Sequence, residues 1–237
     1  MSGGSVVRAW VLRVGLLVAA LGIGIGAAHS APPDFSGVWF VVHPPHALKT
    51  VEGTPPPLTP GARAIYEQHR AAAARGDRSF DGMTRCLPPG LPRLMFVNEP
   101  FEILQHPKVI YFIFQLNRLP RRAYVDEQLP TDPDPLWLGY SVAHWDGDTL
   151  VIDSTGFNDL TLLDDAGLPH SEALRLTERY QLSRDGEHLH ALFTIDDPKS
   201  YTRPWTVKAE YLKRAGYEIP EEFCMDKLRN KRPPGSR

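Results

Sequence analysis

Alternating apolar and polar positions run through most of the chain after residue 100, as in strands that cover a core with one face. An earlier β-rich run occupies residues 35–42, which brings the expected total to about nine strands. The later strands are predicted at residues 101–105, 109–116, 121–125, 138–145, 149–154, 174–182, 189–196 and 205–212. Asp146-Gly147 and Asp185-Gly186 favour tight hairpins between antiparallel neighbours. We therefore predict a mainly β protein, an antiparallel barrel of about eight or nine strands.

One helix is expected before the strands, at about residues 60–75. Thr59 is a typical N-cap, Pro60 suits the first helical position, and Gly76 ends the pattern. Prolines break up residues 43–58. A long loop follows at residues 76–100, and such loops usually line a site or are pinned, so we expect a lid or cap there.

The first thirty residues have the layout of a cleaved secretory signal. Arg8 and Arg13 precede an apolar run at residues 14–28, and Ala28-His29-Ser30 offers a small-x-small cleavage site before Ala31. A membrane anchor is the alternative, but the run contains four glycines and is shorter than the roughly 20 apolar residues of a spanning helix. We predict a single periplasmic or secreted domain of residues 31–237.

Charge and cysteine content agree with an exported protein. The chain without its first thirty residues has 24 basic and 28 acidic residues, which does not indicate nucleic-acid or membrane-surface binding. No later segment is apolar enough to span a bilayer. The two cysteines, Cys86 and Cys224, form a plausible disulfide in an oxidising compartment, and two separate buried thiols are the alternative.

Several short motifs spread over the mature chain resemble a family of uncharacterised exported bacterial proteins. They include Asp34-Phe35-Ser36-Gly37-Val38-Trp39, Trp145-Asp146-Gly147-Asp148-Thr149-Leu150 and Arg203-Pro204-Trp205-Thr206. The Gly-x-Trp opening is similar to that of lipocalin-like barrels. The resemblance implies export and a lipocalin-like fold, and it implies no activity.

Glu178 is the first candidate for a functional side chain. In the predicted strand 174–182 it shares a face with Leu176 and Tyr180, so it would be buried in the barrel. A buried carboxylate is either paired or has a pKa raised towards values useful for proton transfer. Two interpretations stay open, a structural ion pair with an arginine such as Arg122, and catalysis.

His170 is the second candidate, in the polar loop before that strand. Loops at the rim of a barrel often carry function, and an acid such as Asp153 or Asp159 would orient the imidazole as a base. The alternative is that these side chains only hydrogen-bond the backbone of their own loop.

A ligand cavity would be lined by some of the many aromatic residues, because small-molecule pockets are largely apolar with a few polar groups. If Tyr124 faces inward, Arg122 does too, and Arg122 would then anchor a ligand carboxylate or pair with Glu178. The predicted ligand-binding residues are Arg122, Tyr124, Tyr140, Phe157, Tyr180 and Trp205.

Several chemistries lack their motifs. His43-Pro44-Pro45-His46 and His188-Leu189-His190 do not match metal-ligand spacings, and no nucleotide, dinucleotide or nucleophile-elbow motif is present. We expect no metal and no cofactor. The sequence favours a barrel that binds a small apolar or aromatic molecule. Three functions stay open, namely cofactor-independent lyase, isomerase or hydratase chemistry, binding without turnover, and a structural envelope role.

Overall fold

The computed structural model describes Met1 and residues 31–226. The predicted signal segment with its cleavage motif, at residues 1–30, lies outside the described residues apart from Met1, and so do the final residues 227–237. Among the described helices, none is long and apolar enough to cross a membrane.

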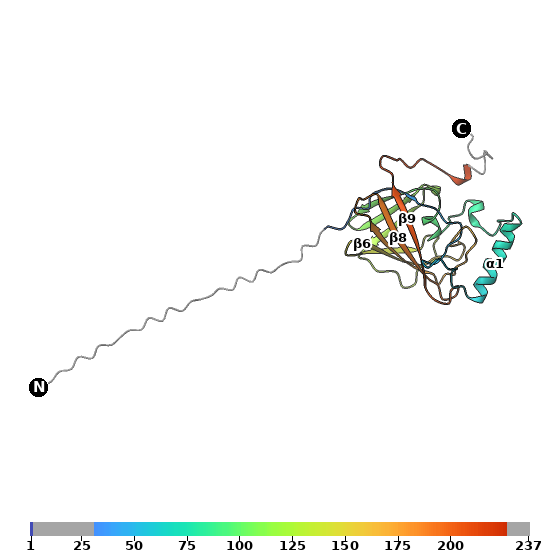
Figure 1. The fold of residues 1–237 in the computed structure, drawn as a ribbon, viewed down its shortest axis with the longest axis horizontal. Helices are drawn as coiled ribbons and strands as arrows, with labels where there is room; N and C mark the ends of the chain where they lie inside the picture. The colour runs from blue at the N-terminus through green and yellow to red at the C-terminus, as the bar shows by residue number, and fades with distance from the viewer. Residues whose placement is uncertain (2–30, 227–237) are drawn as a thin grey trace. The chain divides into compact units, whose positions relative to one another are not determined.

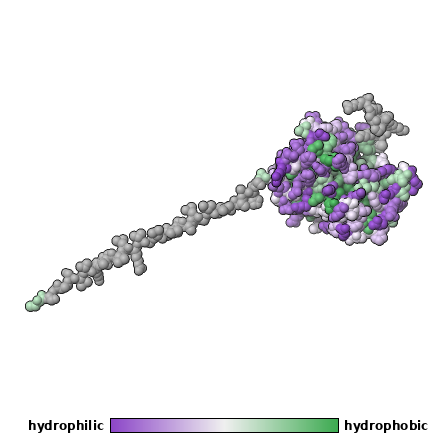
Figure 2. All heavy atoms as spheres, in the orientation of Figure 1, coloured by the Kyte–Doolittle hydropathy of each residue, from purple (hydrophilic) through white to green (hydrophobic). Residues whose placement is uncertain are grey.

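Nine strands form one closed barrel in which each strand lies beside its neighbours in chain order (Figure 1). β1 pairs with both β2 and β9, which closes the sheet. The predicted β-barrel is therefore confirmed. Figure 2 shows one face of this body, on which hydrophilic residues surround a smaller hydrophobic area. The strands are β1 (Gly37–Val41), β2 (Phe101–His106), β3 (Val109–Phe114), β4 (Pro120–Val125), β5 (Tyr140–Asp146), β6 (Thr149–Thr155), β7 (Arg175–Leu182), β8 (His188–Asp196) and β9 (Trp205–Lys213).

One strand pair differs from the prediction of an antiparallel barrel. β4 and β5 are parallel, with Ala123 opposite Ser141, whereas the other neighbouring pairs are antiparallel. Parallel neighbours cannot be joined by a tight hairpin, so the chain must return to the other end of the sheet. Residues 126–139 make this return, and we call them the crossover segment.

The predicted helix is present as α1 (Pro60–Ala74), which lies at the edge of the molecule in Figure 1. The Thr59 side chain caps it by accepting a hydrogen bond from the Ala62 amide, as the sequence predicts. Only Ala62 is fully buried on this helix, so it contributes little to the core.

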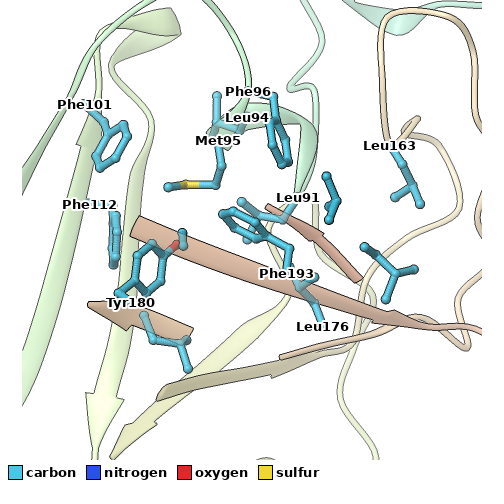
Figure 3. Packing of buried hydrophobic residues seen from close by; sticks show 14 of the residues in the cluster. Leu91, Leu94, Met95, Phe96, Phe101, Phe112, Leu163, Leu176, Tyr180 and Phe193 are labelled. Carbon is cyan, nitrogen blue, oxygen red and sulfur yellow. The ribbon is translucent and has the colours of Figure 1, made fainter. Parts of the chain in front are cut away.

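Part of the long loop at residues 76–100 packs inside the barrel instead of forming a lid over a cavity. Its end forms the 3-10 turn η2 (Arg93–Met95), and residues 91–96 are buried against inward side chains of the strands. In Figure 3, Met95 extends towards Phe112 and Tyr180, and Leu91 lies beside Phe193. We call residues 91–96 the plug. It fills space that the strands alone leave empty.

Polar contacts hold the plug in place. Arg93 donates two hydrogen bonds to Asp81, at 2.9 and 2.8 Å, and contacts Asp165 at 2.7 Å. Burial acts to raise the pKa of Asp81, but the hydrogen bonds and charge of Arg93, together with hydrogen bonds from the Met83 amide and Arg78, outweigh it and leave the pKa below its ordinary value. The Tyr211 hydroxyl donates to the Met95 carbonyl at 3.1 Å.

The predicted disulfide is confirmed. Cys86 and Cys224 are bonded, with their Cα atoms 5.6 Å apart and 138 positions apart in the chain. The bond joins the loop that leads into the plug to the segment after β9.

Met95→Ala tests whether the plug is part of the core. Removing a buried Met side chain leaves a cavity, and we expect the free energy of unfolding to fall by about 3 kcal/mol. Chemical denaturation of the purified protein measures this loss. Met225→Ala is the matched control because Met225 is 55% exposed, and it should change stability by less than about 0.5 kcal/mol. Equal effects of the two substitutions would contradict a packed plug.

Candidate functional site

A stripe of polar side chains crosses the otherwise apolar barrel interior. It runs over four neighbouring strands, because the register places Ser141 of β5 opposite Ser154 of β6, and Arg121 of β4 and Glu178 of β7 lie on either side. All four side chains are buried. The stripe is the one place where the predicted candidate Glu178 meets other functional groups.

Arg121 is the partner of Glu178. Its Nη2 atom lies 2.5 Å from Glu178 Oε2 and 3.0 Å from Ser154 Oγ, and its Nε atom donates to Ser141 Oγ at 3.1 Å. The guanidinium also lies over the Phe112 ring, 5.3 Å from its centre. The interpretation with Arg122 as the partner is therefore wrong by one residue. Arg121 faces inward with Ala123, whereas Arg122 and Tyr124 face outward and are exposed.

Electrostatics favour the structural interpretation of Glu178. Burial raises the pKa of this carboxyl group, and the positive charge and hydrogen bond of Arg121 oppose the shift. The carboxylate raises the pKa of Arg121 in spite of burial, so the guanidinium stays charged. A carboxylate held by a buried, permanently charged arginine has little freedom to exchange a proton.

His170 is buried and both of its ring nitrogens are occupied. Nδ1 lies 3.0 Å from the Ser171 carbonyl oxygen, which can only accept, so we assign the proton to Nδ1. Nε2 then accepts from the Thr161 hydroxyl at 2.6 Å. Burial lowers the pKa of His170, which favours this neutral form. The imidazole therefore holds the loop together and has no free lone pair.

The acids predicted to orient His170 make no hydrogen bond to it. Asp153 lies on β6 and accepts from the Thr177 hydroxyl at 2.6 Å, and Asp159 is exposed. Asp197 is the acid that braces this loop, since it accepts from the Ser171 amide at 2.6 Å and from the Ser171 hydroxyl at 2.7 Å. In the described part of the chain, no hydrogen bond joins His170 to Glu178.

The predicted ligand-binding residues separate into two groups. Phe157, Tyr180 and Trp205 are buried, and Tyr180 packs in the aromatic core beside Phe112 and Phe193. The other three, Arg122, Tyr124 and Tyr140, line one pocket of about 620 Å³ on the outer face of the barrel. The structure thus brings half of the predicted set together, outside the barrel rather than inside it.

This outer pocket exists because β4 and β5 are parallel. Residues of both strands form its base, among them the outward Arg122 and Tyr124, and the crossover segment forms its wall with Leu136 and Leu138. The crossover enters β5 through Gly139, whose φ is +61°. A side chain there would put its Cβ 2.6 Å from the Thr155 carbonyl oxygen, so this approach requires glycine. We call this site the crossover pocket.

Two important residues were missed by the sequence analysis, Arg121 and Asp197. The signal for Arg121 was the small apolar Ala123 two positions later, which indicates an inward face shared by both. The opposite face of the strand carries Tyr124, and an aromatic ring usually indicates a buried face. Asp197 gave no local signal, because its partner Ser171 is 26 residues away in the chain.

No known protein family has a model that matches this chain, and no curated protein matches it.

Glu178→Gln tests whether the Arg121 pair is structural. The substitution leaves a buried positive charge without its partner, so we expect a loss of about 3–5 kcal/mol in unfolding free energy. Urea denaturation measures it. Replacing both residues, as Arg121→Met with Glu178→Leu, should recover most of the loss. The exposed pair of Arg179 and Asp146 is the control, and Asp146→Asn should cost less than about 1 kcal/mol. A cost as small for Glu178→Gln would refute the structural role.

The buried neutral His170 predicts a pH dependence of stability. Its folded pKa is lowered, so between that value and about 6.5 the unfolded chain binds more protons than the folded one. Its contribution is therefore fully present above about pH 6.5 and declines as the pH falls. Unfolding free energy measured from pH 7.5 to 5.5 should decrease less steeply in His170→Gln than in the wild type. The same substitution at exposed His106 should leave the slope unchanged.

Proposed function

We propose that this chain is an exported, non-catalytic binding protein for a small aromatic molecule with an anionic group, and that the ligand occupies the crossover pocket. The observation that carries the proposal is the meeting of Arg122, Tyr124 and Tyr140 in one pocket of about 620 Å³. That volume is in the range of small-molecule sites.

Apolar and aromatic groups in the pocket support an aromatic ligand. Tyr124 is 46% exposed and Leu136 is 40% exposed, so both present apolar surface to solvent at the same place. Covering such surface with a ring gains about 25 cal/mol per Å². Tyrosine rings also favour offset or edge-on contact with another aromatic ring.

Arg122 supports an anionic group on the ligand. It makes no ion pair with another described residue, although Glu127 also lines the pocket. An arginine binds a carboxylate through two parallel hydrogen bonds, which sets the orientation of a planar aromatic acid. Glu127 would disfavour a second negative group, which narrows the ligand to one with a single charged end.

Binding has more support than acid-base catalysis. The catalytic alternative needs His170 and Glu178 to reach a substrate, and both are buried. Thr161 and Ser171 occupy the two ring nitrogens of His170, and Arg121 holds one carboxylate oxygen of Glu178. Glu178 has no exposed surface, and the aromatic core and the plug pack together inside the barrel. A ligand in the crossover pocket meets neither group.

Export is part of this proposal and has two supports. The first thirty residues have the order of regions found in secretory signals. The disulfide between Cys86 and Cys224 suits an oxidising compartment. Membership of the exported lipocalin-like family, suggested by the sequence motifs, would agree with both.

Two matched probes test the proposal, 2-naphthoate and its neutral analogue 2-naphthamide. We expect calorimetry to show one naphthoate per protein, and Arg122→Gln to weaken naphthoate about tenfold with little effect on naphthamide. Tyr124→Ala should weaken both probes, because it removes shared stacking surface.

The matched control is Arg175→Gln, since Arg175 is an exposed arginine of β7 outside the crossover pocket. It should leave both affinities unchanged. Absence of binding by either probe at millimolar concentration, or an equal effect of the two arginine substitutions, would refute the proposed site.

A further inference from the structure

The barrel has another concave surface where the chain leaves β1, which shares no lining residue with the crossover pocket. β1 pairs with β9 only as far as Val41. Beyond it, the Val42 amide still donates to the Glu210 carbonyl at 2.7 Å, and the Val51 amide donates to the Thr206 carbonyl at 2.9 Å. The residues between these two anchors belong to the proline-containing segment 43–50, which is not paired as a strand.

A groove of about 870 Å³ lies between this segment and strands β7, β8 and β9. Outward side chains of the strands, which alternate with the core residues, face it. Leu192 is 43% exposed there and gives the groove an exposed apolar part. Figure 2 shows hydrophobic residues gathered within a hydrophilic surround on the face where β8 and β9 are seen in Figure 1.

Two lysines, Lys49 and Lys208, give the groove its positive charge. Arg179 also lines it but is paired with Asp146 at 2.7 Å, and Glu210 is the acidic residue among the lining. Glu210 already accepts a hydrogen bond from His188, at 2.7 Å. Lys49 and Lys208 are exposed and make no ion pair with another described residue, so their ammonium groups remain available to a ligand.

Imidazoles add further hydrogen-bonding groups to this surface. His43 and His46 come from the segment, and His190 comes from β8. Residues that are far apart in the sequence therefore line the same groove. Among the residues that the structure describes, no three His, Cys, Asp or Glu side chains are placed to share a metal ion. These rings are therefore better suited to hydrogen-bond an anion than to hold a metal.

The positive surface continues on the other side of the same segment. A second pocket, of about 540 Å³, shares His46, Ala47 and Lys49 with the groove and adds Arg70 and Arg78 from the region of α1. Arg78 is paired with Asp81, but no acidic residue lines this pocket. Lys49 thus stands between two basic hollows.

This concentration of positive charge runs against the charge of the rest of the body. Residues 31–226 contain 19 basic and 28 acidic residues, so a basic surface is not a general property of the described chain. Local positive charge on an acidic protein selects anions and steers them to one place. Residues 227–237 carry five basic and no acidic residues, so charge complementarity argues against that segment as the occupant.

We propose that this groove, which we call the basic groove, is a second ligand site that binds a small polyanion, a molecule bearing several phosphate or carboxylate groups. The negative groups contact Lys49 and Lys208, and an apolar part of the ligand rests on Leu192. The site is independent of the crossover pocket, and either can exist without the other.

Calorimetric titration at low salt tests the basic groove with inorganic tripolyphosphate, with tricarballylate as a polycarboxylate and with orthophosphate as a low-charge control. We expect tripolyphosphate to bind at one site per protein, more tightly than orthophosphate and more weakly as salt is added. Comparison of the two polyanions shows whether phosphate or carboxylate is preferred, and binding of either supports the site.

Charge reversals at exposed positions locate the binding. Lys49→Glu and Lys208→Glu should each weaken the polyanion about tenfold, because each turns an attraction into a repulsion. Lys108→Glu is the matched control, since Lys108 is exposed in the β2–β3 turn and lines neither basic hollow.

Three results would overturn this proposal. One is no binding of either polyanion to the wild type at millimolar concentration. Another is an equal loss in Lys108→Glu, which would mean diffuse attraction without a site. The last is a dimer of the free protein that Lys49→Glu dissociates, as measured by sedimentation, since the groove would then be occupied by an acidic surface of a second copy.

Discussion

The filling of the barrel interior is the constraint on which the rest of this structure depends. A closed sheet of nine strands encloses a volume that must be packed to the density of a protein core. Here the strands supply aromatic side chains, and the plug at residues 91–96 adds Leu91, Leu94, Met95 and Phe96 from the side. A plug must be held in place. The ion pair of Arg93 with Asp81 does this, and so does the disulfide that joins the same loop to the segment after β9. The same packing moves the candidate ligand sites to the outside.

Both proposed sites arise where the chain departs from a simple antiparallel meander. The crossover segment is needed because β4 and β5 are parallel, and it leaves a pocket above their outer faces. The segment after β1 separates from β9 between two backbone hydrogen bonds, and it leaves the basic groove. In each case the regular sheet provides a rigid base and the irregular segment provides a wall. Rigid bases with variable walls are where proteins commonly place binding residues.

The buried polar stripe shows that an error of one residue in assigning the inward face of a strand changes which side chains are predicted to meet. The alternation in residues 174–182 correctly places Glu178 inside, because its neighbours Leu176 and Tyr180 leave no doubt about the buried face. The short strand that contains Arg121 to Tyr124 has no such unequal faces, since each face carries one arginine and one apolar or aromatic residue. A shift of one residue exchanges all inward and outward side chains. The predicted partner Arg122 and the predicted cavity residue Tyr124 consequently lie on the outer face, where they form a different pocket.

The sequence by itself determined the strands, the α1 helix with its Thr59 cap, the barrel and the disulfide, because each depends on local alternation, capping chemistry or a pair of cysteines. It also suggested Arg122, Tyr124 and Tyr140 as ligand-binding residues, which stays a prediction, and it did not place them in one outer pocket. Only the tertiary structure decided that β4 and β5 run parallel, that Arg121 pairs with Glu178, and that residues 91–96 fill the barrel. These facts depend on contacts between residues far apart in the chain, such as Arg121 and Glu178 at a separation of 57 positions, and no local pattern encodes which distant side chain completes a buried charge.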